Sequence, residues 1–411
     1  MGCEAAPAAS PEAAASAVAG GLPRTSSAGR LIALDLARGL AILGMFAAHV
    51  GPEPSEGGLL GWLMEAARGR SATLFALLAG FSLVIVTGRP EPRTGRPGRQ
   101  AVAIVLIRSV ILIALGYALT ALDTDVDVIL SYYGMLFVLA LPLYRLRAGT
   151  LAVVAATAAL VMPQVLYLLR AAADGGSWAD TMIEYDPLAR ITDSDGFSEL
   201  FVTGPYPVLT WLPFIVTGMA VAKLDFTRPE VVGRVALAGG ALAVFGYGTS
   251  WLALHFVPGA QAAVNEATGT EAAASAWWSD AVGEDPDTGV PAWLLVAAPH
   301  SQTTWSILAN TGVALAVLAV CFIAMDRSPR IRRPAAPVAA VGSIALTAYV
   351  GHILAIKALG TDDLPGSAAL PVYVGFALAA MLLALIWTRF FRRGPLEYLM
   401  HVATRPALLI K

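Results

Sequence analysis

The sequence is poor in charged residues and in cysteine. Only 14% of its 411 residues are charged, against about a quarter in typical soluble domains, while 57% are hydrophobic and the mean hydropathy is +0.68. The two cysteines, Cys3 and Cys321, lie in a polar segment and an apolar run, so no disulfide framework can be inferred. This composition excludes an ordinary soluble domain and predicts an all-α, polytopic membrane protein.

The sequence also lacks the motifs of soluble catalysis and of nucleic-acid recognition. It contains no Walker loop, dinucleotide fingerprint, nucleophile elbow or HExxH motif. The net charge of −2 and the absence of zinc-finger or RNA-binding signatures give no reason to expect nucleic acid as a partner. No spacing of ligand type predicts a metal site. Any catalysis must therefore arise within the membrane bundle.

The two ends of the chain differ from the apolar middle. Residues 1–30 are rich in Ala, Ser and Pro and lack the charged start and apolar core of a signal peptide. A myristoylation pattern fails because Ala6 stands where Ser or Thr is needed. We expect a disordered cytoplasmic tail over residues 1–30, a transmembrane bundle over 31–395 and a cytoplasmic C-terminal tail over 396–411.

Hydrophobic runs of spanning length recur along the whole middle of the chain. They lie at about residues 31–50, 71–88, 101–122, 128–146, 150–170, 206–223, 233–256, 303–325, 336–358 and 371–391. With a cytoplasmic N-terminus, most Lys and Arg residues fall inside and most acidic residues outside. We therefore expect about ten transmembrane helices in a bacterial inner membrane, with both termini cytoplasmic and long external loops at 171–205 and 257–302.

The first run carries ionisable residues that a lipid-facing helix would avoid. At about 100° per residue, Arg38 and His49 differ by only about 20° around the helix axis, and Asp35 lies within about 60° of both. One face of the helix thus holds all its polar chemistry. That face is expected to point into the bundle.

Four of the five histidines fall near the outer side of the membrane in this topology. They are His49, His255, His300 and His352. Histidine is the side chain best suited to proton transfer near neutral pH, so the pattern indicates an outer reaction chamber. The alternative is that these are interfacial or hydrogen-bonded core residues.

Arginines form the second candidate group. Arg38 and Arg108 each lie seven residues in from the cytoplasmic end of their runs, where two guanidinium groups can clamp a phosphate-bearing donor. Structural pairing, such as Arg38 with Asp35, is the alternative. Arg70, at the outer mouth of the second run, is a candidate for an anionic substrate group or for a surface ion pair. Tyr206 is a candidate substrate contact or an interfacial anchor.

Two stretches near the N-terminus carry a family resemblance. LDLARGLAILGMFAAHV, followed by GRSATLFALLAGFSL, resembles the start of the heparan-α-glucosaminide N-acetyltransferase catalytic family and its bacterial relatives. YPVLTWLPFIVTGMAVAKLD and VGSIALTAYVGHIL are similar to helices of a neighbouring bacterial membrane family of unknown function. The resemblance as a whole extends over about half the chain.

The resemblance implies a multi-helix membrane acyltransferase that moves an acetyl group from cytoplasmic acetyl-CoA to an amino sugar or another envelope acceptor. Family members have an Asn at the outer end of the first helix and a catalytic His in the loop that follows. Here His49 stands near the Asn position, and residues 51–70 contain no histidine. We therefore assign the acid–base or nucleophilic role to His49 itself.

The resulting hypothesis gives each candidate residue a role. His49, His300 and Asp35 form the catalytic group, and Arg38, Arg108, Arg70, His352 and Tyr206 the substrate-binding group. Expected partners are membrane lipids and a small-molecule or glycan acceptor. The sequence leaves open whether the protein forms a homo-oligomer. The rival hypothesis is a transporter or flippase in which the same polar face relays protons or substrate without covalent chemistry.

Overall fold

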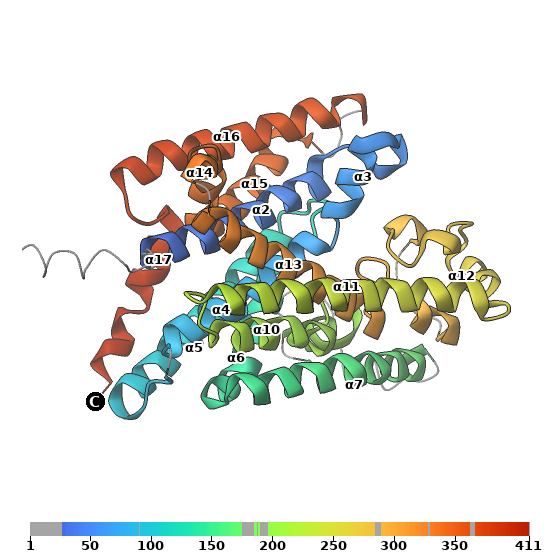
Figure 1. Cartoon of the computed structure of the whole chain (residues 1–411), viewed down its shortest axis with the longest axis horizontal. Coiled ribbons are helices and arrows are strands. Elements are labelled where there is room, and N and C mark those ends of the chain that lie inside the picture. The colour runs from blue at the N-terminus through green and yellow to red at the C-terminus, as the bar shows by residue number, and fades with distance from the viewer. Residues whose placement is uncertain are drawn as a thin grey trace, which may run out of the picture.

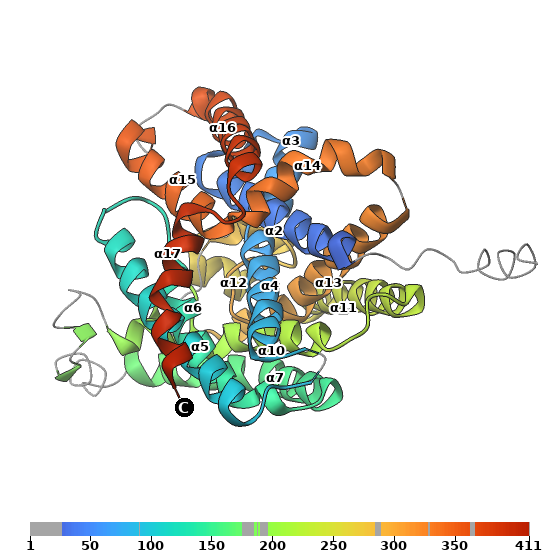
Figure 2. The same ribbon diagram turned by 90° about the vertical axis from the view of Figure 1, so that its left-hand side faces the viewer.

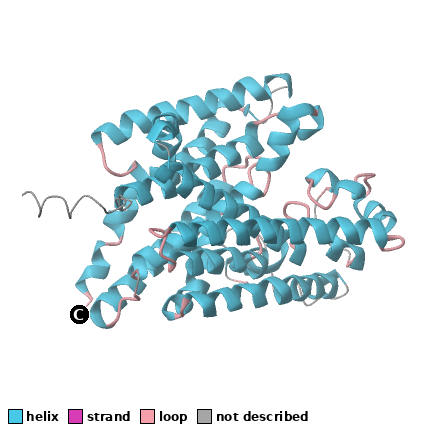
Figure 3. Cartoon of the chain, in the orientation of Figure 1, coloured by secondary structure: helices cyan, strands magenta, loops and turns pink. Residues whose placement is uncertain are grey.

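The computed structural model describes residues 27–89, 91–174, 185–186, 188–189, 196–283, 289–327, 329–361 and 366–410. Within these ranges the chain consists of helices and loops, without a β-strand (Figure 3). The prediction of an all-α membrane fold is confirmed. The predicted N-terminal tail lies outside the described residues, apart from its last four positions, with which the first described helix begins.

The helices form two groups (Figures 1 and 2). One group contains α2 (Ser27–Val50), α14 (Pro329–Ser343), α15 (Ala345–Leu359) and α16 (Ala369–Phe390). The other contains α7 (Ala148–Asp174), α10 (Val208–Ala222) and α11 (Pro229–Phe256). Between and around them lie α3 (Gly58–Ala67), α4 (Arg70–Thr87), α5 (Gly95–Thr120), α6 (Leu130–Ala140), α12 (Ala260–Thr268) and α13 (Thr304–Arg327).

Each of the ten predicted apolar runs is helical, but the described part holds fewer full spans than ten. Seven helices are long and apolar enough to cross a membrane, or up to eight if the bent pair of α14 and α15 is one span. Helix α10 has 15 residues, which cover only about 22 Å of a hydrocarbon core that is ~30 Å thick. Helix α6 gives way after 11 residues to a 3₁₀ turn containing Pro142. Apolar runs in the sequence do not reveal such breaks.

The run at 336–358 is not one straight helix. Helices α14 and α15 meet at an angle of 79° around Ile344. This bend gives α15 its own N-terminus inside the protein. Both helices nevertheless contact α2.

Helix α2 is the centre of the fold, because it packs against α4, α13, α14, α15 and α16. Its contact with α14 is made backbone to backbone at two glycines. A Cβ atom on Gly342 would lie 1.8 Å from the Asp35 carbonyl oxygen, and one on Gly39 would lie 1.9 Å from the Val338 carbonyl oxygen. Only glycine allows this close approach. The crossing therefore fixes the inner half of α2.

The segment predicted as a C-terminal tail is folded onto the bundle. It forms α17 (Pro395–Ala403) and a 3₁₀ turn at Arg405–Leu409. Gln100 on α5 donates hydrogen bonds to the carbonyls of Leu408 and Ile410. The loop at 257–302 is likewise helical over much of its described length, with its own small apolar core around Trp293 and Val264.

Candidate functional site

Two histidines from distant parts of the chain meet inside the bundle. His49, at the last turn of α2, and His352, in the middle of α15, lie with His49 Nδ1 2.9 Å from His352 Nε2. Their rings are nearly parallel, at 8°. His352 is 3% exposed and is flanked by the rings of Phe46 and Tyr349. The pair is therefore held in one geometry by packing.

The hydrogen bonds fix the proton positions of this pair. The Nδ1 atom of His352 is hydrogen-bonded to the backbone carbonyl of Tyr349. A carbonyl can only accept, so His352 carries its proton on Nδ1 and presents Nε2 as an acceptor. His49 must then donate from Nδ1. The Nε2 atom of His49 is left unprotonated, which is the state that a general base requires.

His300 brings a third imidazole to the same place. It interacts electrostatically with His49, and its ring packs against Tyr206 and Trp211. Burial lowers the pKa of His300 below 6.5, although the Pro205 carbonyl and the Asp280 carboxylate oppose this shift. His300 is consequently neutral near pH 7. Three of the four histidines predicted on the outer side, His49, His300 and His352, therefore lie close together.

The loop that carries His300 has a strained backbone, which specific hydrogen bonds hold in place. His300 and Gln302 have φ angles of 59° and 58°, a region that side-chain-bearing residues rarely adopt. The Gln302 amide accepts a hydrogen bond from Thr210 Oγ1 at 2.7 Å and donates one to the Pro205 carbonyl at 3.1 Å. Gly69, also at positive φ, lies against this loop, and its Cβ would be 3.4 Å from His300. Such strain persists only where surrounding contacts hold it.

His255 does not join the cluster. It lies near the C-terminus of α11 with its Nδ1 atom 2.8 Å from the Trp251 carbonyl oxygen, and it stacks on the Trp251 ring. This is the hydrogen-bonded surface role that the alternative hypothesis gave it. His401, the remaining histidine, is on α17 at the other end of the bundle.

Arg38 and Arg108 line one cavity of about 270 Å³ beside the N-terminal half of α2, the end predicted to be cytoplasmic, and we call it the inner cavity. Arg38 donates to Asp35 at 3.0 Å and to Ser82 at 2.8 Å. Arg108 lies across the cavity on α5, and its buried Nε atom has no hydrogen-bond partner among the described residues. A buried donor without a partner is costly. The cavity therefore offers an unused donor and cationic charge to an anionic ligand.

Glu397 also borders this cavity, but its carboxylate is already engaged. It accepts from the backbone N–H groups of Leu346 and Thr347 and from the Thr347 hydroxyl. It thus caps the N-terminus of α15, where the helix dipole favours negative charge. A residue of the C-terminal segment consequently positions the helix that carries His352.

The inner cavity and the histidine pair are linked through a tyrosine. Tyr349 lines the cavity and, from the same turn of α15, packs against the His352 ring with the ring centroids 5.1 Å apart. Its hydroxyl accepts a hydrogen bond from the Ile129 N–H, which fixes the ring. The rise of α2 separates Arg38 from His49 by about 16 Å. Both lie on the inward face of that helix, as the sequence predicted.

A second polar pocket, of about 480 Å³, lies at the end of the bundle that the sequence predicts to face outward, and we call it the outer pocket. Arg68 forms ion pairs there with Glu53 at 2.8 Å and Asp280 at 2.9 Å. Trp62 and Trp278 supply aromatic walls. Because Gly69 contacts the loop of His300, and Asp280 interacts electrostatically with His300, this pocket adjoins the histidine cluster.

Of the other predicted site residues, Asp35 and Arg70 lie apart from the histidine cluster, whereas Tyr206 contacts His300. Asp35 pairs with Arg38 and is about 21 Å of helix rise from His49. Arg70 is 8% exposed and donates to Tyr247 Oη, the Glu65 carbonyl and the Trp278 carbonyl. Tyr206 is buried beside His300, with its hydroxyl 3.4 Å from the Asp127 carbonyl oxygen. Arg70 thus joins α4 to α11 and the outer loop.

The sequence hypothesis missed Ser82, Glu397 and the outer pocket. Ser82 lies in an apolar run without any distinguishing pattern, and Glu397 lies in a segment expected to be a tail. An acidic residue two positions after Pro395 does mark a helix start, but not its partner. Among the described residues, no group of three or more His, Cys, Asp or Glu side chains could hold a metal ion.

Comparison with known families matches two parts of the chain. The sequence model of the heparan-alpha-glucosaminide N-acetyltransferase catalytic family matches residues 30–246, which include His49, Arg38 and Arg108. The model of a family of unknown function, DUF418, matches residues 289–406, which include His300, His352 and Glu397. No curated protein matches the chain. The histidine pair therefore joins one residue from each matched region.

Proposed function

The chain belongs to the heparan-alpha-glucosaminide N-acetyltransferase catalytic family, a family of membrane acyltransferases, and from this premise we propose its reaction. It transfers an acetyl group from cytoplasmic acetyl-CoA to an amino sugar or related envelope acceptor on the outer side of the inner membrane. The observation that carries the proposal is the His49–His352 hydrogen bond, which leaves His49 Nε2 as a base.

The inner cavity supplies the donor site. Arg38 and Arg108 present two guanidinium groups, which match phosphate oxygens in charge and geometry. At about 270 Å³ the cavity is below the ~300–1,000 Å³ of sites for drug-sized ligands. It therefore receives one phosphate-bearing part of acetyl-CoA, with the thioester directed past Tyr349 toward the histidines.

The histidine pair carries the proton transfers of the reaction. His49 Nε2 takes the proton from the acceptor amine or hydroxyl as its nitrogen or oxygen attacks the thioester carbonyl. The new C–N or C–O bond forms, the C–S bond breaks, and the thiolate of CoA takes the proton back from His49. His352 stabilises the charged ring of His49 through Nε2 and keeps its tautomer fixed.

The outer pocket is the proposed entrance for the acceptor. Tryptophan faces provide apolar surfaces against which a sugar ring packs, and the carboxylates of Glu53 and Asp280 accept hydrogen bonds from hydroxyl or ammonium groups. Their proximity to His300 brings such an acceptor to the histidine cluster. Donor and acceptor would thus reach His49 from opposite sides.

Radiolabelled acetyl-CoA tests this function in proteoliposomes. Wild-type protein should move label from external acetyl-CoA, on the donor face, to glucosamine inside the vesicle. His49→Ala should reduce the rate by about 10²–10⁴-fold, the usual contribution of a general base. The matched control is His255→Ala, which removes an exposed imidazole that stacks on Trp251 away from the histidine cluster.

The two rival functions give different results in the same vesicles. Release of the internal glucosamine that needs no acetyl-CoA, with no acetylated product, would refute the proposed transfer and favour a transporter. An unaltered rate in His49→Ala would refute the assigned base. Equal losses in His49→Ala and His255→Ala would show that the assay reports folding, which thermal unfolding of both variants measures separately.

A further inference from the structure

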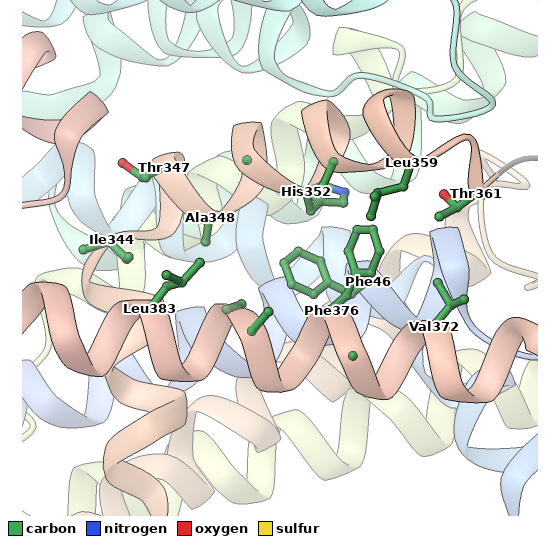
Figure 4. A pocket seen from close by; sticks show the side chains of 15 residues that line it. Phe46, Ile344, Thr347, Ala348, His352, Leu359, Thr361, Val372, Phe376 and Leu383 are labelled. Carbon is green, nitrogen blue, oxygen red and sulfur yellow. The ribbon is translucent and has the colours of Figure 1, made fainter.

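An apolar groove of about 660 Å³ lies between α15 and α16, on the face of α15 away from the inner cavity (Figure 4). Its walls are mostly small or aliphatic residues, among them Ala348, Gly351 and Ala355 on α15 and Gly375 and Leu383 on α16. Phe46 and His352 lie on its floor (Figure 4). The same histidine that bonds to His49 therefore borders this groove.

The groove opens toward the membrane. Helix α16 is long and apolar enough to cross a membrane, yet only 11% of the residues in its apolar 18-residue stretch are buried in the protein. Leu378, Leu382 and Ile386 are exposed on it. Gly351 and Gly375 are exposed, and a Cβ atom on either would meet nothing within 4 Å. An apolar hollow at this depth is continuous with the surface that lipid chains cover.

The polar groups of the groove indicate an occupant with one polar end. Only Thr347, His352 and Thr361 among the lining residues are polar. The Thr347 hydroxyl donates to Glu397 at 2.6 Å. The Thr361 Oγ1 atom, at the outer end of the groove, is buried without a hydrogen-bond partner in the described part of the chain. A lipid whose polar part lies between Thr361 and His352 and whose chain runs toward Leu383 satisfies both the hydroxyl and the apolar walls.

We propose that this groove binds the hydrocarbon chain of a lipid-linked acceptor from the outer leaflet. The proposal rests on the acyl transfer proposed above and specifies its acceptor. With the chain in the groove, the amine or hydroxyl of the headgroup lies at the histidine pair, where His49 takes its proton as it attacks the thioester. Donor and acceptor then occupy opposite faces of α15 and meet at Tyr349 and His352.

Photolabelling of the full-length protein tests the site itself. The probe is phosphatidylcholine with a diazirine in one acyl chain, reconstituted into vesicles with the protein and followed by peptide mapping. Phe46 is 2% exposed on α2, so an acyl chain reaches it through the groove. Wild-type protein should be labelled at Phe46. Gly375→Leu should lower that labelling roughly tenfold, as expected when a side chain overfills a packed site.

Two further variants keep this experiment decisive. If Gly375→Leu does not fold, Gly351→Leu replaces it, because it fills the groove from the opposite wall. Gly240→Leu on α11 is the matched control, because it adds the same side chain at an exposed helical glycine with open space around it. Labelling confined to the outer residues of α16 would overturn the proposal. So would protection of the groove by a second copy, detected as crosslinks between two α16 helices.

Kinetics then separate the lipid site from the acyl transfer. The ratio of kcat/KM for dodecyl glucosaminide to that for glucosamine should fall about tenfold in Gly375→Leu, as for an overfilled site, and should not change in Gly240→Leu. An unchanged ratio in Gly375→Leu would overturn the acceptor assignment. If Phe46 is labelled but neither compound is acetylated by wild-type protein, the proposed function fails while the lipid site stands.

Discussion

The two ends of α2 solve the problem of buried polarity in different ways. At the inner end, charged groups line a cavity, and the guanidinium of Arg108 retains a donor without a partner among the described residues. At the outer end, the neutral imidazoles of His49 and His352 are hydrogen-bonded to each other, and the unprotonated Nε2 of His49 is not used in that bond. The first arrangement is suited to holding charge, and the second to moving a proton.

In the proposed reaction, the inner end of α2 therefore binds the donor and the outer end carries out the proton transfer. Loss of a charge-holding residue should change the affinity for the donor, whereas loss of a proton-handling residue should change the rate of the chemical step. Three predictions test that division, in addition to the transfer and labelling experiments above. They are ordered by the size of the expected effect.

His352→Phe should lower kcat by about 10²-fold, at the lower end of the range for acid–base groups, with little change in the KM for acetyl-CoA. Phenylalanine keeps the ring but removes the acceptor that fixes the tautomer of His49. Steady-state kinetics in proteoliposomes measure both constants. His352→Asn, whose amide oxygen accepts a hydrogen bond, should recover part of the rate; if Asn and Phe are equally impaired, His352 acts only through packing.

Arg108→Gln should raise the KM for acetyl-CoA about tenfold, the value of one lost hydrogen bond to a charged group, while kcat stays nearly constant. Arg234→Gln, on α11 outside the cavity, is the control. S-acetylpantetheine, which lacks the phosphates of CoA, sharpens the test. Wild type and Arg108→Gln should use it equally well, and a tenfold difference on this donor would point to a structural role for Arg108.

The pH dependence should reveal the burial of His300. Because its pKa is lowered below 6.5, the ring stays neutral to a lower pH than a free histidine, and the acid limb of kcat should lie below pH 6.5. Tyr206→Ala exposes the ring to water and should move that limb upward. The unfolded state binds more protons as the pH falls through 6.5, so stability should also decrease there. An unshifted limb in Tyr206→Ala would separate His300 from the chemistry.

Patterns local to one helix were predictable from the sequence. The inward face of α2 with Asp35, Arg38 and His49 follows from helical periodicity, and each of the ten apolar runs is helical. The distribution of Lys and Arg residues predicted the topology, and that topology placed Arg38 and Arg108 at the same depth in the membrane. The two side chains do line one cavity. In each case the controlling interactions lie within about one helix length.

Features that depend on distant partners were not predictable. The stretch around Ile344 contains no proline at the bend, and the α15 N-terminus is capped by Glu397 from about 50 residues later in the chain. Burial of Arg70 likewise depends on Tyr247 and Trp278 from other elements. Spacing along one sequence carries no information about which helices become neighbours, so these residues were assigned to the wrong surroundings or missed.

The hydrogen bond between His49 and His352 also bears on the biosynthesis of the protein. It joins residues 303 positions apart, and the helix that carries His352 is capped by Glu397, later still. During synthesis α2 enters the membrane long before α15 and its cap exist. A nascent chain therefore carries an unpaired His49 and no oriented base, so that activity begins only after the ribosome has added Glu397.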